Sequence, residues 1–277
     1  EICRNLGIYY QKAGGTIQKA LQEGREAVSI FQRIGKEETA GGADANGNVG
    51  DALRRIDPKA AITEYKKAHA IRRKLNIQDA CNYENLGYAE LEDNQLDNAL
   101  MNFRKGGEIR ETQGSTAHII HARTLGLIGR IMAIKKDYEQ AFEHFDNSLT
   151  LFSKLGSRSG SDSIEIMRYL AIAQLETGDV CGALATLEEP RMLQTGPDGN
   201  IFDTEISALL CETLCDAHAA AGHAPEADEY YELAKKVHNH LDSANVWPKK
   251  WQELEEKMRT NKREVQRGTT RKMIVQL

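Results

Sequence analysis

Proline is scarce in this sequence, which has 5 prolines in 277 residues, while charged residues make up 28 %. A proline inside a helix removes a backbone hydrogen bond, so a chain with so few of them favours long helices. No apolar run approaches the roughly 18 residues that a membrane span needs. The net charge is only −5, which gives no overall attraction to nucleic acid or to a membrane surface. We therefore expect a helical protein that has neither nucleic acid nor a membrane as its partner.

Cysteines are also few, and their number does not indicate a disulfide framework. The chain has 5 cysteines, an odd number, without the tight spacing of a small disulfide-bonded domain. Free thiols are typical of a reducing compartment, so we expect a cytoplasmic location. The sequence begins Glu-Ile-Cys and lacks a basic-then-apolar leader. We expect it to start inside a longer protein or to have been trimmed.

Patterns of catalytic residues are missing as well. Residues 41–50, "GGADANGNVG", are rich in glycine, but a phosphate-binding loop needs Gly-x4-Gly-Lys-Ser/Thr after a strand. The segment therefore indicates a flexible loop between two helical units. No Ser-His-Asp or Cys-His pairing follows from the spacing of these residue types. We expect a protein that is not an enzyme and that has no cofactor.

Internal repetition is what the sequence does contain. In "NYENLGYAELEDNQLDNALMNF", residues 82–103, a Leu-Gly pair precedes a polar turn, and Ala99 precedes Phe103 by four residues. A small residue or a proline follows three residues later in each copy, and an apolar-plus-small pair lies 12 to 14 residues before each alanine. The copies recur every 38 to 44 residues, at Ala20, Ala61, Ala99, Ala141, Ala183 and Ala227.

Each copy predicts two helices joined by a polar turn. Apolar residues at i, i+3, i+4 and i+7 mark one face of each helix. Helices pack with axes about 8–10 Å apart, and the closest crossings admit only glycine or alanine, with aromatic side chains filling the neighbouring gaps. One pair of helices cannot bury its apolar face alone, so successive pairs must stack into a solenoid.

The best copy, with Leu86, Gly87, Ala99 and Phe103, resembles the tetratricopeptide repeat family, and the likeness covers about residues 2–243. The usual period is about 34 residues, whereas the period here is nearer 42. In this respect the chain is similar to kinesin light chain and to the sensor arrays of maltose-activator-type ATPases. The resemblance implies an all-α, right-handed superhelical solenoid in which the first helix of each pair lines a concave groove.

We expect about six helix-turn-helix repeats in residues 1–246, then a capping helix in 247–262 and a basic tail in 263–277. Trp247 and Trp251 lie on one face of the capping helix, which would cover the last repeat. The end of the chain either contacts an acidic partner or is merely solvated or disordered. The approximate repeats are 2–35, 45–76, 80–115, 122–157, 164–193 and 208–243.

One cluster has the spacing of a metal site. In "CETLCDAH", Cys211, Cys215 and His218 lie at i, i+4 and i+7 on one helical face. A fourth ligand is missing from the local spacing, although His223 is near in sequence. Because Cys215 falls at the repeat position of Gly87, we expect the two thiols to fill the core and to bind no metal.

The groove is where the resemblance implies that a ligand binds. The residues of the first helices that packing does not require are expected to face it, and three arginines among them would form a basic centre suited to carboxylate or phosphate. The alternative is a charged face that is merely solvated. The candidate residues are Glu84, Tyr88, Arg123, Arg130, Arg168, Glu212 and Asp216.

These features predict a non-catalytic scaffold that binds a peptide or protein segment in its concave groove. The expected ligand is an acidic or C-terminal segment, because the proposed centre is basic. The alternative is a ligand-sensing regulatory array of a larger signalling protein, a STAND ATPase or similar, whose catalytic module lies outside this chain. The sequence leaves the identity of the partner and the oligomeric state open.

Overall fold

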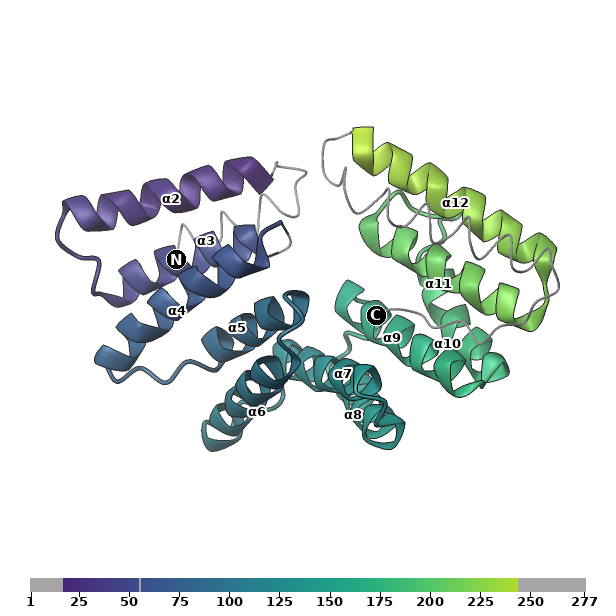
Figure 1. Ribbon diagram of the computed structural model, residues 1–277, viewed down its shortest axis with the longest axis horizontal. Coiled ribbons are helices and arrows are strands. Elements are labelled where there is room, and N and C mark those ends of the chain that lie inside the picture. The colour runs from purple at the N-terminus through teal and green to yellow at the C-terminus, as the bar shows by residue number, and fades with distance from the viewer. Residues whose placement is uncertain (1–16, 55, 244–277) are drawn as a thin grey trace. The chain divides into compact units, whose positions relative to one another are not determined.

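The computed structural model describes residues 17–54 and 56–243, and these residues are helices joined by turns, with one isolated bridge between Thr195 and Ile201 (Figure 1). The expected all-α class is confirmed. In this part of the chain the helices are α2 (Ile17–Arg33), α3 (Ala40–Leu53), α4 (Pro58–Lys74), α5 (Ala80–Glu92), α6 (Leu96–Thr112), α7 (Ile119–Ile134), α8 (Tyr138–Lys154), α9 (Ser161–Thr177), α10 (Val180–Leu193), α11 (Glu205–Ala221) and α12 (Ala224–Ser243).

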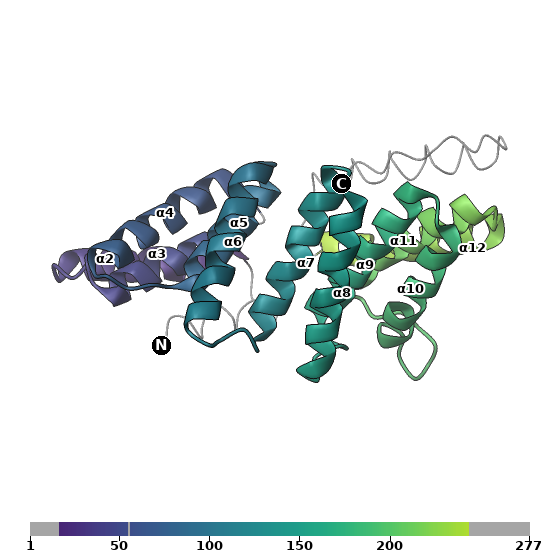
Figure 2. The same cartoon turned by 90° about the horizontal axis from the view of Figure 1, so that it is seen from below.

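The chain divides into two compact units, one up to Thr124 and one from Leu125, so that the division falls within α7. In the first unit α2 packs on α3, α3 on α4, α4 on α5 and α5 on α6 (Figures 1 and 2). In the second unit α8 packs on α9, α9 on α10, α10 on α11 and α11 on α12, and α11 also contacts α9. Each unit is therefore a stack of consecutive helices.

Close crossings within a pair are made by a small residue of the first helix and an aromatic residue of the second. A β-carbon added at Gly87 would lie 2.9 Å from the ring of Phe103 and 3.1 Å from the backbone oxygen of Ala99. Gly129 stands in the same relation to Phe145, since its added β-carbon would lie 2.9 Å from that ring. Ala99 and Phe103 are both buried. The packing that the repeat pattern predicts is confirmed at these crossings.

The glycine-rich segment of residues 41–50 is helical and forms most of α3, so the prediction of a flexible loop was wrong. Thr39 caps the helix, because its Oγ1 accepts a hydrogen bond from the backbone nitrogen of Gly42 at 3.3 Å. A β-carbon at Gly42 would lie 2.1 Å from the backbone oxygen of Glu37, and one at Gly50 would lie 2.7 Å from the Tyr65 ring. The glycines permit close packing, and packing overrides their low helix propensity.

The helix ends follow local signals in the sequence. "QRIG" and "SKLG" end helices as expected, with Gly35 at φ 63° and Gly156 at φ 64°, a left-handed conformation that glycine adopts without strain. Asp57, Asp137 and Asp179 each accept a hydrogen bond from a backbone nitrogen in the first turn of the helix that follows. These signals explain why the second helices begin and end where they do.

Several expected features fall on residues that the structure does not describe. The first helix of the repeat expected at 2–35, the capping helix at 247–262 and the basic tail at 263–277 lie outside the described residues. The other expected repeats each overlap one pair of helices, namely α3–α4, α5–α6, α7–α8, α9–α10 and α11–α12. The first helices α3, α7, α9 and α11 begin three to five residues before the expected repeat starts at 45, 122, 164 and 208. The repeat boundaries and the right-handed winding stay predictions. No helix among the described residues is long and apolar enough to cross a membrane.

Candidate binding sites on the first helices

Tyr88 of α5 is the centre of a cluster of charged and aromatic side chains in the first unit. The guanidinium carbon of Arg54, which follows α3, lies 4.0 Å from the centre of the Tyr88 ring. The guanidinium carbon of Arg123, from α7, lies 4.4 Å from the same point. At this range a cation is attracted by the electron-rich face of the ring. We call these three residues the Tyr88 cluster.

Arg54 is the residue of this cluster that the sequence did not reveal. Its Nε is buried and has no hydrogen-bond partner. One turn before Arg54, the carboxylate of Asp51 accepts a 2.6 Å hydrogen bond from Oη of Tyr65 on α4. Burial, followed by the Asp51 charge, raises the pKa of Tyr65 well above its usual value, so the phenol stays protonated and keeps donating. Because residues 41–50 were interpreted as a loop, Arg54 was not recognised as a residue at the end of a first helix.

A second cluster of the same kind lies in the second unit. The guanidinium carbon of Arg130, from α7, lies 4.6 Å from the centre of the Tyr169 ring on α9, and that of Arg168 lies 4.8 Å from it. Tyr169 Oη donates a 2.8 Å hydrogen bond to Glu165. The Nε of Arg168 is buried without a hydrogen-bond partner. We call Tyr169, Arg130 and Arg168 the Tyr169 cluster.

The three arginines of the expected basic centre contact two different tyrosine rings. Arg130 and Arg168 contact the same ring in the second unit, whereas Arg123 contacts Tyr88 in the first. Tyr88 itself is buried, so it supports the arginines rather than facing the groove as an open contact. A joint centre of Arg123, Arg130 and Arg168 stays a prediction.

Glu84 does not face an open groove, and this expectation needs correction. Its two carboxylate oxygens accept hydrogen bonds from Nε and Nη2 of Arg110, both at 2.6 Å, and both side chains are buried. Gly106 lies opposite on α6 and leaves room for Glu84, because an added β-carbon there would come within 2.8 Å of its side chain. Glu84 therefore joins α5 to α6.

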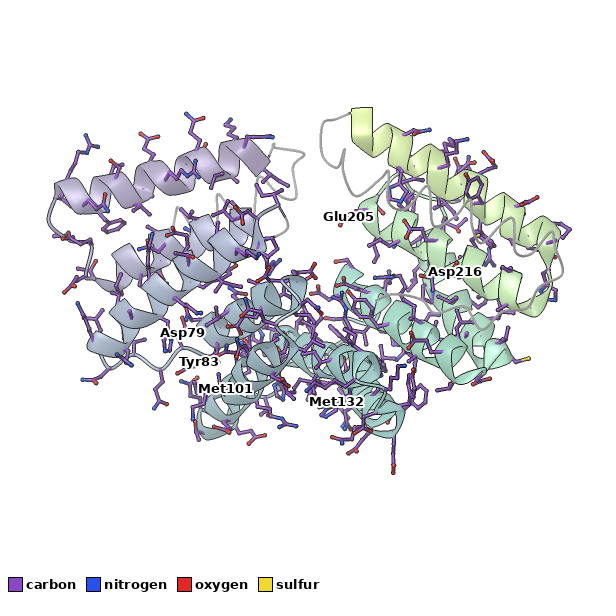
Figure 3. The ribbon with its side chains drawn as sticks, viewed as in Figure 1. Asp79, Tyr83, Met101, Met132, Glu205 and Asp216 are labelled. Atoms are coloured by element: carbon purple, nitrogen blue, oxygen red, sulfur yellow. The ribbon has the colours of Figure 1, made fainter. Side chains whose placement is uncertain are left out.

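The two acidic candidates on α11 are also largely covered. Glu212 is paired with His238 of α12 at 2.6 Å, and only 11 % of its side chain is exposed. Asp216, labelled on α11 in Figure 3, is buried. An ion pair with α12 thus uses Glu212, Asp216 is covered, and neither residue presents an open carboxylate.

The cysteine cluster of α11 packs as expected. Cys211 and Cys215 belong to a hydrophobic cluster that also contains Ala227 and Tyr231 of α12. Burial raises the pKa of the Cys211 thiol to about 12. His218 stacks on Tyr230, with ring centres 5.4 Å apart. In the part of the chain that the structure describes, no three His, Cys, Asp or Glu side chains are grouped as metal ligands.

A polar pocket of about 340 Å³ lies between α3 and α5, which are the first helices of two successive pairs, and we call it the α3–α5 pocket. Arg72 joins its walls, with hydrogen bonds or ion pairs to Asp44 at 2.6 Å, Asp79 at 3.0 Å and Asn82 at 2.9 Å. Figure 3 labels Asp79, which caps the start of α5. Sequence periodicity does not reveal this pocket, because its residues come from the three helices α3, α4 and α5 and from the turn before α5. The lining residues are Ala40, Asp44, Gly47, Asn48, Asp51, Tyr65, Arg72, Ile77, Gln78, Asp79, Cys81, Asn82 and Asn85.

Comparison with known proteins finds likeness in structure rather than in sequence. No protein-family model matches the chain, and no curated protein sequence matches it. BtubC (BKLC) from P. vanneervenii aligns with a TM-score of 0.63 at 16 % identity, over 84 % of this chain and 95 % of that one. A putative kinesin light chain of Podosopora anserina with TPR-like repeats gives 0.55 at 16 % identity, over 74 % and 98 %. The chain has a tetratricopeptide-type fold.

PilF of Pseudomonas aeruginosa has the same fold. It aligns with a TM-score of 0.56 at 18 % identity, over 86 % of this chain and 91 % of that one. Since all these identities are low, the likeness shows the fold alone. The resemblance that the sequence suggested is confirmed at this level, and the binding properties of the tetratricopeptide-type solenoid must be argued from its own side chains.

Proposed function

We propose that this chain is a non-catalytic scaffold that binds a peptide or protein segment along its first helices, and that the segment is acidic or presents a carboxyl terminus. The fold supports the general part of the proposal, because stacked helix pairs offer an extended surface rather than an enclosed cavity. The observation that carries the specific part is the pairing of arginines with a tyrosine ring in the Tyr88 and Tyr169 clusters.

The clusters suit a carboxylate for a physical reason. A ring contact restricts the guanidinium without using its N–H groups, so the planar fork keeps donors for a bidentate partner. The Nε atoms of Arg54 and Arg168 are buried and unbonded, and an unsatisfied buried donor costs about 1–3 kcal/mol. A carboxylate that accepts from these atoms removes this cost. Binding to such a ligand is therefore favoured over leaving the arginines as a solvated charged face.

The proposed location is the cytoplasm, as the sequence analysis expected. Free thiols support it, since Cys81, Cys181, Cys211 and Cys215 form no disulfide. Thiols persist where the compartment is reducing. The proposal includes no catalytic step and no cofactor.

Selection from a random dodecapeptide library with free carboxyl termini tests the proposal. The full chain is the bait, and Arg54→Ala and Arg168→Ala are compared with Arg25→Ala and Lys236→Ala, which remove exposed cations elsewhere. We expect the recovered peptides to be rich in Asp and Glu or to require the free terminus, and to be lost with the first two variants only. Recovery of neutral or basic peptides alone, or of no binder, would overturn the proposal.

A further inference from the structure

Asn82 has a donor that nothing in the described structure satisfies. The residue lines the α3–α5 pocket and is only 4 % exposed. Its Oδ1 accepts a 2.9 Å hydrogen bond from Arg72 Nη1, which fixes the orientation of the amide. Its Nδ2 is buried without a hydrogen-bond partner. Buried polar groups are nearly always bonded, so this nitrogen indicates a missing acceptor, such as a backbone carbonyl of a ligand, reached directly or through one water.

The pocket carries an excess of negative charge. Its charged lining residues are the carboxylates of Asp44, Asp51 and Asp79 against the one cation, Arg72. Asp79 is largely committed to Arg72 and to capping α5. The side chain of Asp44 is 46 % exposed even though it accepts from Arg72, and a carboxylate has lone pairs for further donors. A concave surface lined by more carboxylates than cations attracts a cation.

The shape of the pocket favours a cation on a long stem over a metal ion. In the residues that the structure describes, the acidic side chains are not grouped as a set of metal ligands. Ala40, Gly47 and Ile77 add apolar surface to the lining. The methylene chains of lysine and arginine cover such surface while their charged ends stay hydrogen-bonded. One basic residue of a peptide supplies both groups: its backbone carbonyl accepts from Asn82, and its side-chain cation pairs with Asp44.

We infer that the α3–α5 pocket binds a lysine or arginine residue of the segment that the scaffold binds. The inference rests on the proposed function, because it assigns a second feature to the same ligand. On α3 the acidic side chain of Asp44 precedes Arg54 by ten residues, which corresponds to about 15 Å of helix. An extended peptide covers this distance in about four or five residues. The basic residue therefore lies about four or five positions from the carboxylate that Arg54 binds.

A capped amino acid tests the pocket without knowledge of the partner. The probes are N-acetyl-lysine-N-methylamide and its uncharged analogue N-acetyl-norleucine-N-methylamide, titrated into the ¹⁵N-labelled full chain. The side-chain amide signal of Asn82 is assigned with Asn82→Asp, which removes the amide but keeps an oxygen for Arg72. We expect the lysine probe to shift this signal saturably and the norleucine probe to leave it in place.

Variants decide whether the charge of the pocket is responsible. Asp44→Asn should weaken binding of the lysine probe about threefold or more, while Glu26→Gln, an exposed change on α2, should leave it unchanged. Melting temperatures show whether each variant is folded. Asp51→Asn removes a second carboxylate of the pocket and is measured in the same way.

Equal shifts with both probes, shifts confined to other residues, or the same shifts with Ca²⁺ alone at lower concentration would each overturn the inference. If the library yields acidic peptides but the lysine probe is silent, only this inference fails; a library without binders removes the proposed function itself.

Discussion

The guanidinium of Arg54 lies 4.0 Å from the centre of the Tyr88 ring, and this contact joins the end of α3 to the C-terminal half of α5. The two residues are 34 positions apart, so only the stacking of helix pairs brings them together. The same stacking brings Arg130 of α7 to Tyr169 of α9. Arginine side chains on the first helices thus lie against tyrosine rings, and the proposed function depends on these contacts.

Glycines in the first helices give a prediction in which two substitutions of the same kind have opposite signs. Gly87→Ala should destabilise the chain by about 1–3 kcal/mol, because the new methyl group would lie 3.1 Å from a backbone oxygen that cannot move alone. Gly47→Ala, with nothing within 4 Å of the new atom, should stabilise it by about 0.5–1 kcal/mol through helix propensity. Urea denaturation measures both free energies of unfolding. Equal effects at the two positions would mean that the crossing at Phe103 is not close.

The buried ion pair of Glu84 and Arg110 predicts a large loss of stability when only one of the two residues is replaced. Glu84→Leu should cost about 3–5 kcal/mol, because it leaves a buried guanidinium without its carboxylate. Adding Arg110→Met should recover much of this loss, since both charges are then absent. Glu108→Ala, which breaks an exposed pair with Lys105, is the control and should leave stability nearly unchanged. If Glu84→Leu is as stable as the parent, Glu84 is not buried against Arg110 and faces the groove or solvent instead.

Cysteine reactivity should differ sharply between two thiols. Burial raises the pKa of Cys211 to about 12, so at pH 8 almost none of it is thiolate, and its alkylation should accelerate only as the pH rises toward that value. Cys181 is exposed and should react with iodoacetamide at pH 8 in the native protein. Peptide mapping by mass spectrometry reads the two sites separately, with urea-unfolded protein as the control. Rapid native labelling of Cys211 would contradict its place in the core.

The parts of the fold that the sequence predicts are the local ones. Ala99 and Phe103 lie four residues apart on one helix, so their spacing alone places both at a crossing, and Gly156 marks a helix end by its neighbours. Glu84 was misplaced because its partner is 26 residues away on α6, and the periodicity of a single helix does not show which charges meet. The glycine-rich α3 was misread because the contacts that its glycines permit, such as that of Gly50 with Tyr65, are tertiary and do not show in the local sequence. That error also hid Arg54 and the α3–α5 pocket.

Salt dependence gives a further prediction for the acidic ligand. Attraction between a carboxylate and the arginine clusters is screened by ions, so affinity for a selected acidic peptide should fall as sodium chloride is raised from low to physiological concentration. A peptide with its carboxylates replaced by amides is the matched control and should bind weakly at every salt concentration. Affinity that is independent of salt, and equal for the two peptides, would point to an apolar surface instead.

The most direct test of the account is the affinity of the best acidic peptide for arginine variants, measured by fluorescence anisotropy on the full chain. We expect Arg168→Ala and Arg54→Ala each to weaken binding about tenfold, equivalent to about 1.4 kcal/mol, with little change in melting temperature. The combination of Arg123→Ala, Arg130→Ala and Arg168→Ala should abolish measurable binding, while Arg25→Ala and Lys236→Ala leave it unchanged. If the combined variant binds as tightly as the parent, the ligand uses another surface and the arginine–tyrosine clusters are not its site.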